Sequence, residues 1–255
     1  MKFDFFKTAL PKDCFQGACD VHCHLLPGVD DGFPTTEKTL EALTWLGAHG
    51  IRKMKLTPHF MKEYPENTRT AIEERFSKLQ EEWNATCAEQ QAASRVASPK
   101  PVELSLAGEY MLDACFMDRC EEGFLTLDKE EVLVLCETSY LMMEAQSKER
   151  LYEIMLKGYQ PVIAHPERYR YADQALYERW KQRDYLFQLN LLSLAGAYGN
   201  TAKAKARELL SKGMYDFVGS DLHRLSNLEQ MVASIRLTKK EVEALMRLIE
   251  NNKTL

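Results

Sequence analysis

The chain has 255 residues and a formal net charge of −5; 45% of its residues are apolar and 28% are charged. This composition is typical of a soluble globular protein, and the length favours a single domain over residues 1–255 with an N-terminal extension at 1–17. The acidic balance argues against a protein that binds nucleic-acid phosphates, and no apolar run approaches the roughly 20 residues that cross a bilayer, so we expect no nucleic-acid partner and no membrane insertion.

Short apolar runs alternate with helical patterns along most of the chain. The runs that predict strands lie at residues 18–23, 53–57, 102–107, 132–136, 161–164, 185–190 and 215–219. Between them, a 3.6-residue periodicity predicts helices at residues 36–48, 68–91, 146–157 and 202–211. Residues 93–101 are expected to form a surface linker, and Thr238 with Glu241 a capping box at the start of a C-terminal helix.

Repeated strand–helix units indicate the α/β class and a parallel sheet, because parallel strands need a crossover between them. About seven units predict a closed or nearly closed TIM-like barrel. A doubly wound open sheet is the alternative. No glycine-rich phosphate loop of the GxGxxG or GxxxxGK type follows any predicted strand, which weighs against that alternative.

Five of the six histidines lie at the C-terminal ends of predicted strands. His22 and His24 point to the same side of the first strand, since alternate residues of a strand share a face. Asp221 and His223 repeat this spacing after the last strand. Other members of the set end or follow the remaining strands and the first loop: Asp31, His59, Glu109, Glu137 and His165. In a parallel barrel this end of the strands is the catalytic face.

These nine side chains would bring five imidazoles and four carboxylates together. Without metal ions, like charges in such a cluster would be desolvated against each other. Mixed imidazole and carboxylate ligands suit manganese, iron, zinc or magnesium, and nine ligands can hold two or three ions. The sixth histidine, His49, precedes Gly50 near a helix end, where we expect a capping or surface residue.

The seven cysteines do not support thiol chemistry. None has an Arg six positions later, as a cysteine-dependent tyrosine phosphatase requires. A zinc knuckle from Cys14, Cys19 and Cys23 is disfavoured because no second cysteine pair lies nearby. An odd number without a regular spacing is typical of mostly buried thiols in a reducing compartment, so we expect a cytoplasmic protein.

At these same residues the sequence resembles a known family. The segments DVHCHLLPGVDDG at 20–32, TPH at 57–59, GEY at 108–110, AHPERY at 164–169 and GSDLH at 219–223, with Glu137 between the third and fourth, resemble the successive motifs of the PHP (polymerase and histidinol phosphatase) superfamily. PGVDDG and AHPERY resemble in particular the metal-dependent protein tyrosine phosphatases of bacterial capsule and exopolysaccharide loci. The resemblance implies a distorted TIM-like (β/α)7 barrel of the PHP type with a trinuclear metal site.

Carried over position by position, the resemblance implies one set of metal ligands: His22, His24, Asp31, His59, Glu109, Glu137, His165, Asp221 and His223. It assigns the substrate phosphate to Arg168, three residues after His165. The family commonly has a second Arg a few residues beyond the last histidine. This chain reads RLSNLEQ there, so Arg224 is the candidate. The candidate catalytic residues are therefore Arg168, Arg224, Asp221 and His223.

The function implied is that of a metal-dependent phosphomonoesterase, a protein tyrosine phosphatase that acts on the tail of a tyrosine autokinase of polysaccharide export. Two or three divalent ions are expected, manganese first. A water held between ions would attack phosphorus without a covalent phosphoenzyme. Three alternatives stay open: a small-molecule phosphatase such as histidinol phosphatase, a nuclease or phosphodiesterase, and a metal-containing interaction module without turnover.

Two further groups of residues are candidates for substrate contacts. Arg170 is either part of a basic rim with Arg168 and Arg224 or a solvated surface charge. Phe60, Tyr64 and Tyr110 follow predicted ligands closely. They are candidates for lining a pocket for a phenyl ring, with ordinary packing as the alternative.

Overall fold

The computed structural model describes residues 7–93, 101–130, 132–143 and 146–255. Its strands are β1 Lys7–Thr8, β2 Cys19–Cys23, β3 Lys53–Leu56, β4 His59–Phe60, β5 Glu103–Leu106, β6 Glu109–Met111, β7 Leu133–Glu137, β8 Gln160–Ala164, β9 Leu186–Asn190, β10 Phe217–Gly219 and β11 Leu237–Thr238. Its helices are α1 Thr36–Ala48, α2 Arg69–Ala93, α3 Phe116–Glu122, α4 Ser147–Leu156, α5 Gln174–Lys181, α6 Leu191–Ala195, α7 Gly199–Ser211, α8 Leu228–Ser234 and α9 Lys239–Asn251. Short 3-10 helices lie at Pro166–Arg168 and Asn252–Thr254.

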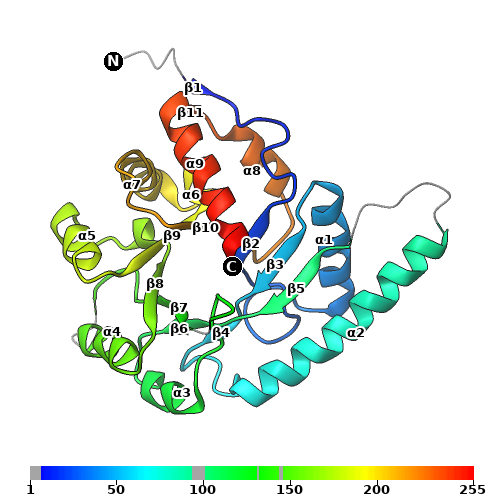
Figure 1. Ribbon diagram of the computed structural model, residues 1–255, viewed down its shortest axis with the longest axis horizontal. Coiled ribbons are helices and arrows are strands. Elements are labelled where there is room, and N and C mark those ends of the chain that lie inside the picture. The colour runs from blue at the N-terminus through cyan, green and yellow to red at the C-terminus, as the bar shows by residue number, and fades with distance from the viewer. Residues whose placement is uncertain (1–6, 94–100, 131, 144–145) are drawn as a thin grey trace.

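Two parallel sheets form the centre of the molecule. One has the order β10-β9-β8-β7-β6-β4 and the other β2-β3-β5. Figure 1 shows the strands curled around a centre, with α1 to α5, α7 and α9 outside them. The α/β class and the parallel arrangement predicted from the sequence are confirmed.

Two of the predicted strands are each broken into two segments. The second continues as β3 and then β4, and the third as β5 and then β6. Pro58 lies in the first break and has no N–H group to donate to a ladder. Gly108 lies in the second, where a Cβ atom would come 2.8 Å from ring carbons of both Phe60 and Tyr110. The expectation that His59 and Glu109 end strands was therefore wrong: they begin β4 and β6 and pair with each other in parallel register.

Hydrogen bonds connect β2, at one edge, with the segment around β10, at the other. His24 N donates to Leu222 O at 3.0 Å, and Asp221 N donates to His22 O at 2.8 Å. Asn252 lies at the opposite end of these strands, where its amide donates to Cys19 O at 2.8 Å and its carbonyl oxygen accepts from Val218 N at 3.1 Å. The two sheets are thus tied together at both ends of β2 and β10.

Apolar side chains fill the space inside the curl. On β7, Leu133 and Leu135 belong to a small inner cluster, whereas Val134 and Cys136 belong to the larger cluster packed under the helices. Glu137, two residues after Leu135, therefore lies on the inner side as well. The inner face is apolar at the start of the strand and polar at its end, and this pattern gives the polar end an apolar floor.

Most predicted helices have the expected position. The helix expected at 36–48 is α1, with Thr35 as a cap that accepts from Lys38 N, and α2, α4 and α7 begin or end within a few residues of prediction. The capping box of Thr238 and Glu241 is confirmed at α9. The linker expected at 93–101 lies almost wholly outside the described residues. Within the described parts of the chain, no helix combines the length and apolar character needed to span a membrane.

Candidate metal centre

The nine side chains predicted as ligands gather at the C-terminal ends of the central strands. His22 lies in β2 and Glu137 ends β7, whereas His59 begins β4 and Glu109 begins β6. The others lie on loops: His24 and Asp31 after β2, His165 after β8, and Asp221 and His223 after β10. Seven of the nine are buried: His22, His24, His59, Glu109, Glu137, His165 and Asp221. The other two lie at the mouth, where the side chains of His223 and Asp31 are 25% and 61% exposed.

Four ligand atoms form a compact group at the bottom of the site. His22 Nε2 and His24 Nε2 lie 3.3 Å apart, and each lies 3.3–3.4 Å from both Glu109 Oε2 and Asp221 Oδ1. Two ligand atoms that each lie about 2.0–2.2 Å from one ion are roughly 3–3.5 Å apart. The spacing of the two imidazole nitrogens from each other and from each carboxylate oxygen therefore fits bound metal, and His22, His24 and Glu109 form one of the candidate metal-binding groups.

A second group shares Glu109. His59 Nδ1 lies 3.1 Å from Glu109 Oε2 and 3.4 Å from Glu137 Oε1, and His165 Nε2 lies 3.0 Å from Glu109 Oε1. Among the described residues, His59 Nδ1, Glu109 Oε2 and His165 Nδ1 are buried without a hydrogen-bond partner. Such atoms are rarely left unpaired in a folded protein, so His59 Nδ1 and Glu109 Oε2 also fit a bound cation.

A third, more open group lies at the mouth. Asp31 Oδ1 is 3.5 Å from His59 Nε2 and 3.4 Å from His223 Nε2. In the described parts of the chain, the candidate metal-binding groups of three or more residues contain histidine, glutamate and aspartate but no cysteine. The structure therefore gives no support to the zinc knuckle weighed for Cys14, Cys19 and Cys23, and the ligand set suits manganese, iron, zinc or magnesium.

The buried charges depend strongly on one another. Burial, together with the neighbouring Glu109, raises the pKa of Glu137 to about 8. Burial opposes the ionisation of Glu109 as well, but His22 and His59 hold its pKa well below the ordinary value. Burial and the positive charge of Arg168 lower the pKa of His165 to about 4. The carboxylates thus need cationic neighbours, which are either protonated imidazoles or metal ions.

Two acceptors that the sequence did not single out orient the first two histidines. Gln188 Oε1 lies 2.9 Å from His22 Nδ1, and Asp30 Oδ2 lies 2.9 Å from His24 Nδ1. Because these oxygens accept, each Nδ1 carries the proton, and each Nε2 keeps its lone pair for the centre of the site. The same oxygens also accept from the backbone N–H groups of His165 and His59.

The sequence contains features that point to the supporting residues Asp30, Gln188 and Asn190. Asp30 is the first aspartate of the DDG segment, and its side chain is fully buried, whereas Asp31 lies exposed at the mouth. Gln188 and Asn190 are polar residues at the end of a predicted strand. Asn190 Nδ2 donates to Asp221 Oδ2 at 2.8 Å. Polar residues at the ends of parallel strands are therefore a sequence signal for this site, as the histidines are.

Two of the site residues have a left-handed backbone. His165 has φ 33° and Asp221 has φ 52°, a region that L residues other than glycine rarely adopt. Strain of this kind costs on the order of 1–3 kcal/mol per residue and concentrates at functional sites.

Arg168 is held rigidly beside the candidate ligands. Its Nη1 lies 2.6 Å from Asp221 Oδ2, and its guanidinium carbon lies 4.3 Å and 4.0 Å from the ring centroids of Tyr140 and Tyr198. Tyr140 also donates to Glu137 Oε2 at 3.1 Å. Two aromatic rings and a carboxylate therefore fix the guanidinium beside the candidate ligands.

Arg168 lines a hollow of about 550 Å³ next to the ligands. The exposed Arg224 lines it too, together with Asp31, Asp221 and His223. The remaining wall is partly apolar and includes Leu192, Ala197 and Met231. Arg170 is exposed and does not line the hollow.

The aromatic residues that follow ligands divide into two groups. Phe60 and Tyr110 are buried and stack with a 4.6 Å centroid separation, and Tyr110 Oη accepts from Leu125 N. The pocket-lining interpretation was therefore wrong for these two. Tyr64 lies parallel to His59 at 6.1 Å, near the site. His49 caps α1 and stacks on Trp45 at the surface, as expected.

Comparison with known proteins gives one consistent result. Residues 18–254 match the family model described as "Capsular polysaccharide synthesis, CpsB/CapC". The chain is 29% identical to the tyrosine-protein phosphatase YwqE of Bacillus subtilis (strain 168) over 81% of this chain and 77% of that protein. It is 25% identical to the putative tyrosine-protein phosphatase CapC of Staphylococcus aureus over 92% and 89% of the two chains.

A solved structure is similar over most of its length. It comes from the crystallographic work on YwqE from Bacillus subtilis and CpsB from Streptococcus pneumoniae, which calls them unique metal-dependent tyrosine phosphatases. The TM-score is 0.72 with 25% identity, and the match covers 93% of each chain.

Replacing Gln188 by Leu should weaken metal binding, because His22 loses the acceptor that fixes its tautomer. Loss of such a supporting contact typically lowers metal affinity by about 10–100-fold. Titration of the stripped protein with Mn²⁺ or Zn²⁺ against a competing chelator measures this affinity. Gln188→Glu, which keeps an acceptor oxygen, should restore most of it, and the exposed Gln90→Leu should have no effect. Unchanged affinity in Gln188→Leu would contradict the assigned contact.

Proposed function

The chain belongs to the CpsB/CapC family of capsular polysaccharide synthesis, and from this membership we propose that it is a metal-dependent protein tyrosine phosphatase. The observation that carries the proposal is the group of buried imidazoles and carboxylates around Glu109, with Arg168 fixed at its side. The substrate we propose is a phosphotyrosine-bearing protein, in particular the tail of a tyrosine autokinase of polysaccharide export.

The nine predicted ligands are proposed to hold two or three divalent ions, manganese first, with iron, zinc or magnesium as alternatives. Ions bound there would neutralise charge on a phosphate and make hydroxide available near neutral pH. Three observations support the assignment: the 3.3–3.4 Å spacing of His22 Nε2 and His24 Nε2 from Glu109 Oε2, the unpaired buried atoms, and the two acceptors that direct both Nε2 atoms inward.

Arg168 is proposed to bind the non-bridging oxygens of the phosphate through its guanidinium. Contacts with Tyr140, Tyr198 and Asp221 hold the guanidinium in place, so little entropy is lost when the phosphate arrives. Asp221, which pairs with Arg168, and His223 stay candidate catalytic residues at the same wall of the hollow. A tyrosyl leaving group is good, so the reaction needs positioning and charge neutralisation more than a strong general acid.

The hollow beside the ligands supports an aryl phosphate as substrate. Arg168 and Arg224 bring positive charge to one part of its wall, and Leu192, Ala197 and Met231 bring apolar surface to another. A phosphate and a phenyl ring would meet complementary surfaces there. The similarity to tyrosine-protein phosphatases over most of the chain favours phosphotyrosine over histidinol phosphate as the substrate. Arg224 is proposed to assist Arg168 in place of the family's second Arg.

We further propose a closed barrel architecture and a cytoplasmic location for this protein. Counting β3 with β4 and β5 with β6 gives seven parallel strands, and the hydrogen bonds from β2 to the segment after β10 support a single distorted (β/α)7 barrel of the PHP type. The seven cysteines are unpaired, which supports a cytoplasmic location.

Steady-state hydrolysis of a phosphotyrosyl peptide, a phosphoseryl peptide and histidinol phosphate tests the proposal directly. With added Mn²⁺ the phosphotyrosyl peptide should have the highest kcat/KM, and a chelator should abolish turnover. A preference for histidinol phosphate would be consistent with metal-dependent hydrolysis but would refute phosphotyrosine as the substrate. Turnover that survives exhaustive chelation would refute the metal role.

Arg168→Ala should lower kcat/KM for p-nitrophenyl phosphate by about 100-fold or more, because a charge-assisted contact to the phosphate in a water-poor site is lost. Metal content, measured by elemental analysis, should stay as in the unmodified protein. Arg170→Ala is the matched control, since Arg170 is exposed, lies on the same loop and does not line the hollow. Equal activity of the two variants would refute the role of Arg168.

A further inference from the structure

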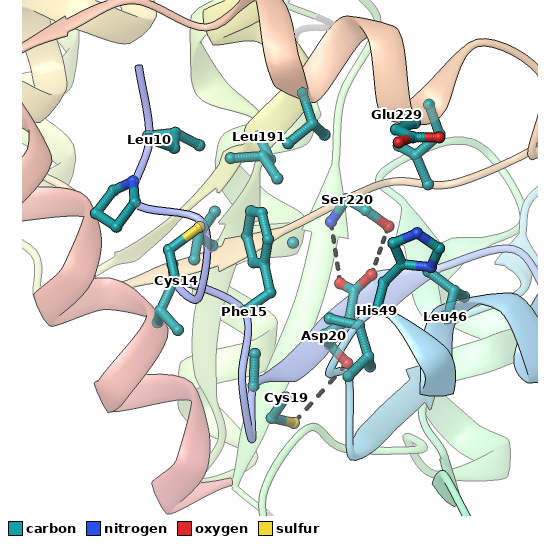
Figure 2. A pocket seen from close by; sticks show the side chains of 18 of the residues that line it. Leu10, Cys14, Phe15, Cys19, Asp20, Leu46, His49, Leu191, Ser220 and Glu229 are labelled. Carbon is teal, nitrogen blue, oxygen red and sulfur yellow. Dashed lines mark hydrogen bonds between the residues drawn. The ribbon is translucent and has the colours of Figure 1, made fainter. Parts of the chain in front are cut away.

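A second hollow lies on the other side of α8 from the substrate hollow. It measures about 520 Å³, and its walls come from the N-terminal segment, the end of α1, β10, α8 and α9. Figure 2 shows Phe15 with its ring among Leu10, Cys14 and Leu191, with the Asp20–Ser220 pair beside it. The volume is within the range of small-molecule sites, which is roughly 300–1,000 Å³.

The roof of this hollow lies outside the part of the chain that matches the family model. Residues 9–12, 14 and 15 line it, and all of them precede residue 18, where the family match begins. The segment is tied down at both ends. β1 pairs antiparallel with β11, and Gly17 N donates to Gly50 O at 2.8 Å. The N-terminal extension that the sequence left without a role therefore encloses a cavity.

The buried polar groups of the hollow already satisfy each other. Asp20 Oδ1 accepts from Ser220 N at 2.9 Å and Asp20 Oδ2 accepts from Ser220 Oγ at 2.5 Å. The side-chain amide of Asn252 is paired with Cys19 and Val218. Lys12, His49 and Glu229 are exposed, so they belong to the rim.

Water would find few partners inside such a hollow, because a buried water needs two to four polar contacts. An anion or cation would have no free counter-charge in the interior. A molecule without charge and with mainly apolar surface suits both the volume and the lining. Burial of its surface would stabilise the complex by roughly 25 cal/mol per Å² before the entropy of association is subtracted.

Helix α8 is the common wall of the two hollows. Leu228 lines both, Met231 lines the substrate hollow, and Val232 lines the second hollow. The Asp20–Ser220 pair provides another connection, since Asp20 Oδ1 also accepts from His22 N and Ser220 precedes Asp221. A molecule that fills the cavity would support α8 in the position where it lines the substrate hollow.

We propose that the N-terminal segment, residues 7–17, roofs a binding site for a small, uncharged, mainly apolar molecule, and that its occupancy stabilises α8 and thereby the substrate hollow. The effect on turnover rests on the proposed phosphatase function. The binding itself and the ordering of α8 do not.

N-phenyl-1-naphthylamine, an uncharged probe whose fluorescence rises in apolar surroundings, tests the site in the full-length, metal-loaded protein. Saturable binding with one probe per chain is expected. Leu10→Trp fills the cavity from the roof and Val232→Phe from α8, and each should weaken binding at least tenfold. Asp13→Trp is the matched control, since Asp13 is exposed in the same segment and does not line the cavity. Absent binding, or equal binding by all variants, would overturn the site.

Two measurements test whether bound probe stabilises α8 and the substrate hollow. Bound probe should slow amide hydrogen exchange in residues 228–234 and should lower KM for p-nitrophenyl phosphate at least twofold, with no change in metal content. Unchanged exchange in α8 on saturation would overturn the link even if the probe binds. If no phosphate ester is turned over but probe binding and slowed exchange are found, the phosphatase proposal fails and the apolar site stands.

Discussion

A carboxylate with no exposed surface lies at the centre of this molecule, and the rest of the site is arranged around it. Glu109 oxygens lie 3.0–3.4 Å from ring nitrogens of His22, His24, His59 and His165, which lie in or directly after β2, in β4 and after β8. An uncompensated buried charge costs several kcal/mol, and Glu137 beside it adds to the cost. Divalent ions among these atoms would remove that cost and would supply the chemistry of phosphoester hydrolysis.

The inner face of β7 shows how the fold meets this requirement. Leu133 and Leu135 are part of the apolar interior, and Glu137 follows two residues later, where the strand ends. Breaks after β3 and β5 let the chain begin new segments with His59 and Glu109 directly paired. Gln188 and Asp30 then fix the ring orientation of His22 and His24. The arrangement depends on the register of strand pairing. A shift of one residue in the register of any of these strands would turn a ligand away from the centre.

Much of this could be predicted from the sequence, because residue type and strand periodicity carry local information. Most of the strands, α1, the capping box and the residues that gather at the mouth follow from patterns over a few residues. The breaks at Pro58 and Gly108 could not be predicted, since they depend on which sheet each half joins. The core position of Phe60 and Tyr110 and the contact of Gln188 with His22 also depend on contacts between strands that are distant in the sequence. The cavity under residues 9–15 depends on packing among four distant segments, which periodicity does not encode.

X-ray diffraction from crystals of the protein purified without chelator, recorded at the manganese, iron and zinc absorption edges, tests the central claim most directly. We expect two or three metal-ion peaks among the nine side chains, anomalous unless the ion is magnesium, one of them about 2.0–2.3 Å from His22 Nε2, His24 Nε2 and Glu109 Oε2. Crystals with no metal-ion density at these atoms, anomalous or otherwise, grown from protein that hydrolyses phosphotyrosine at full rate, would contradict the claim.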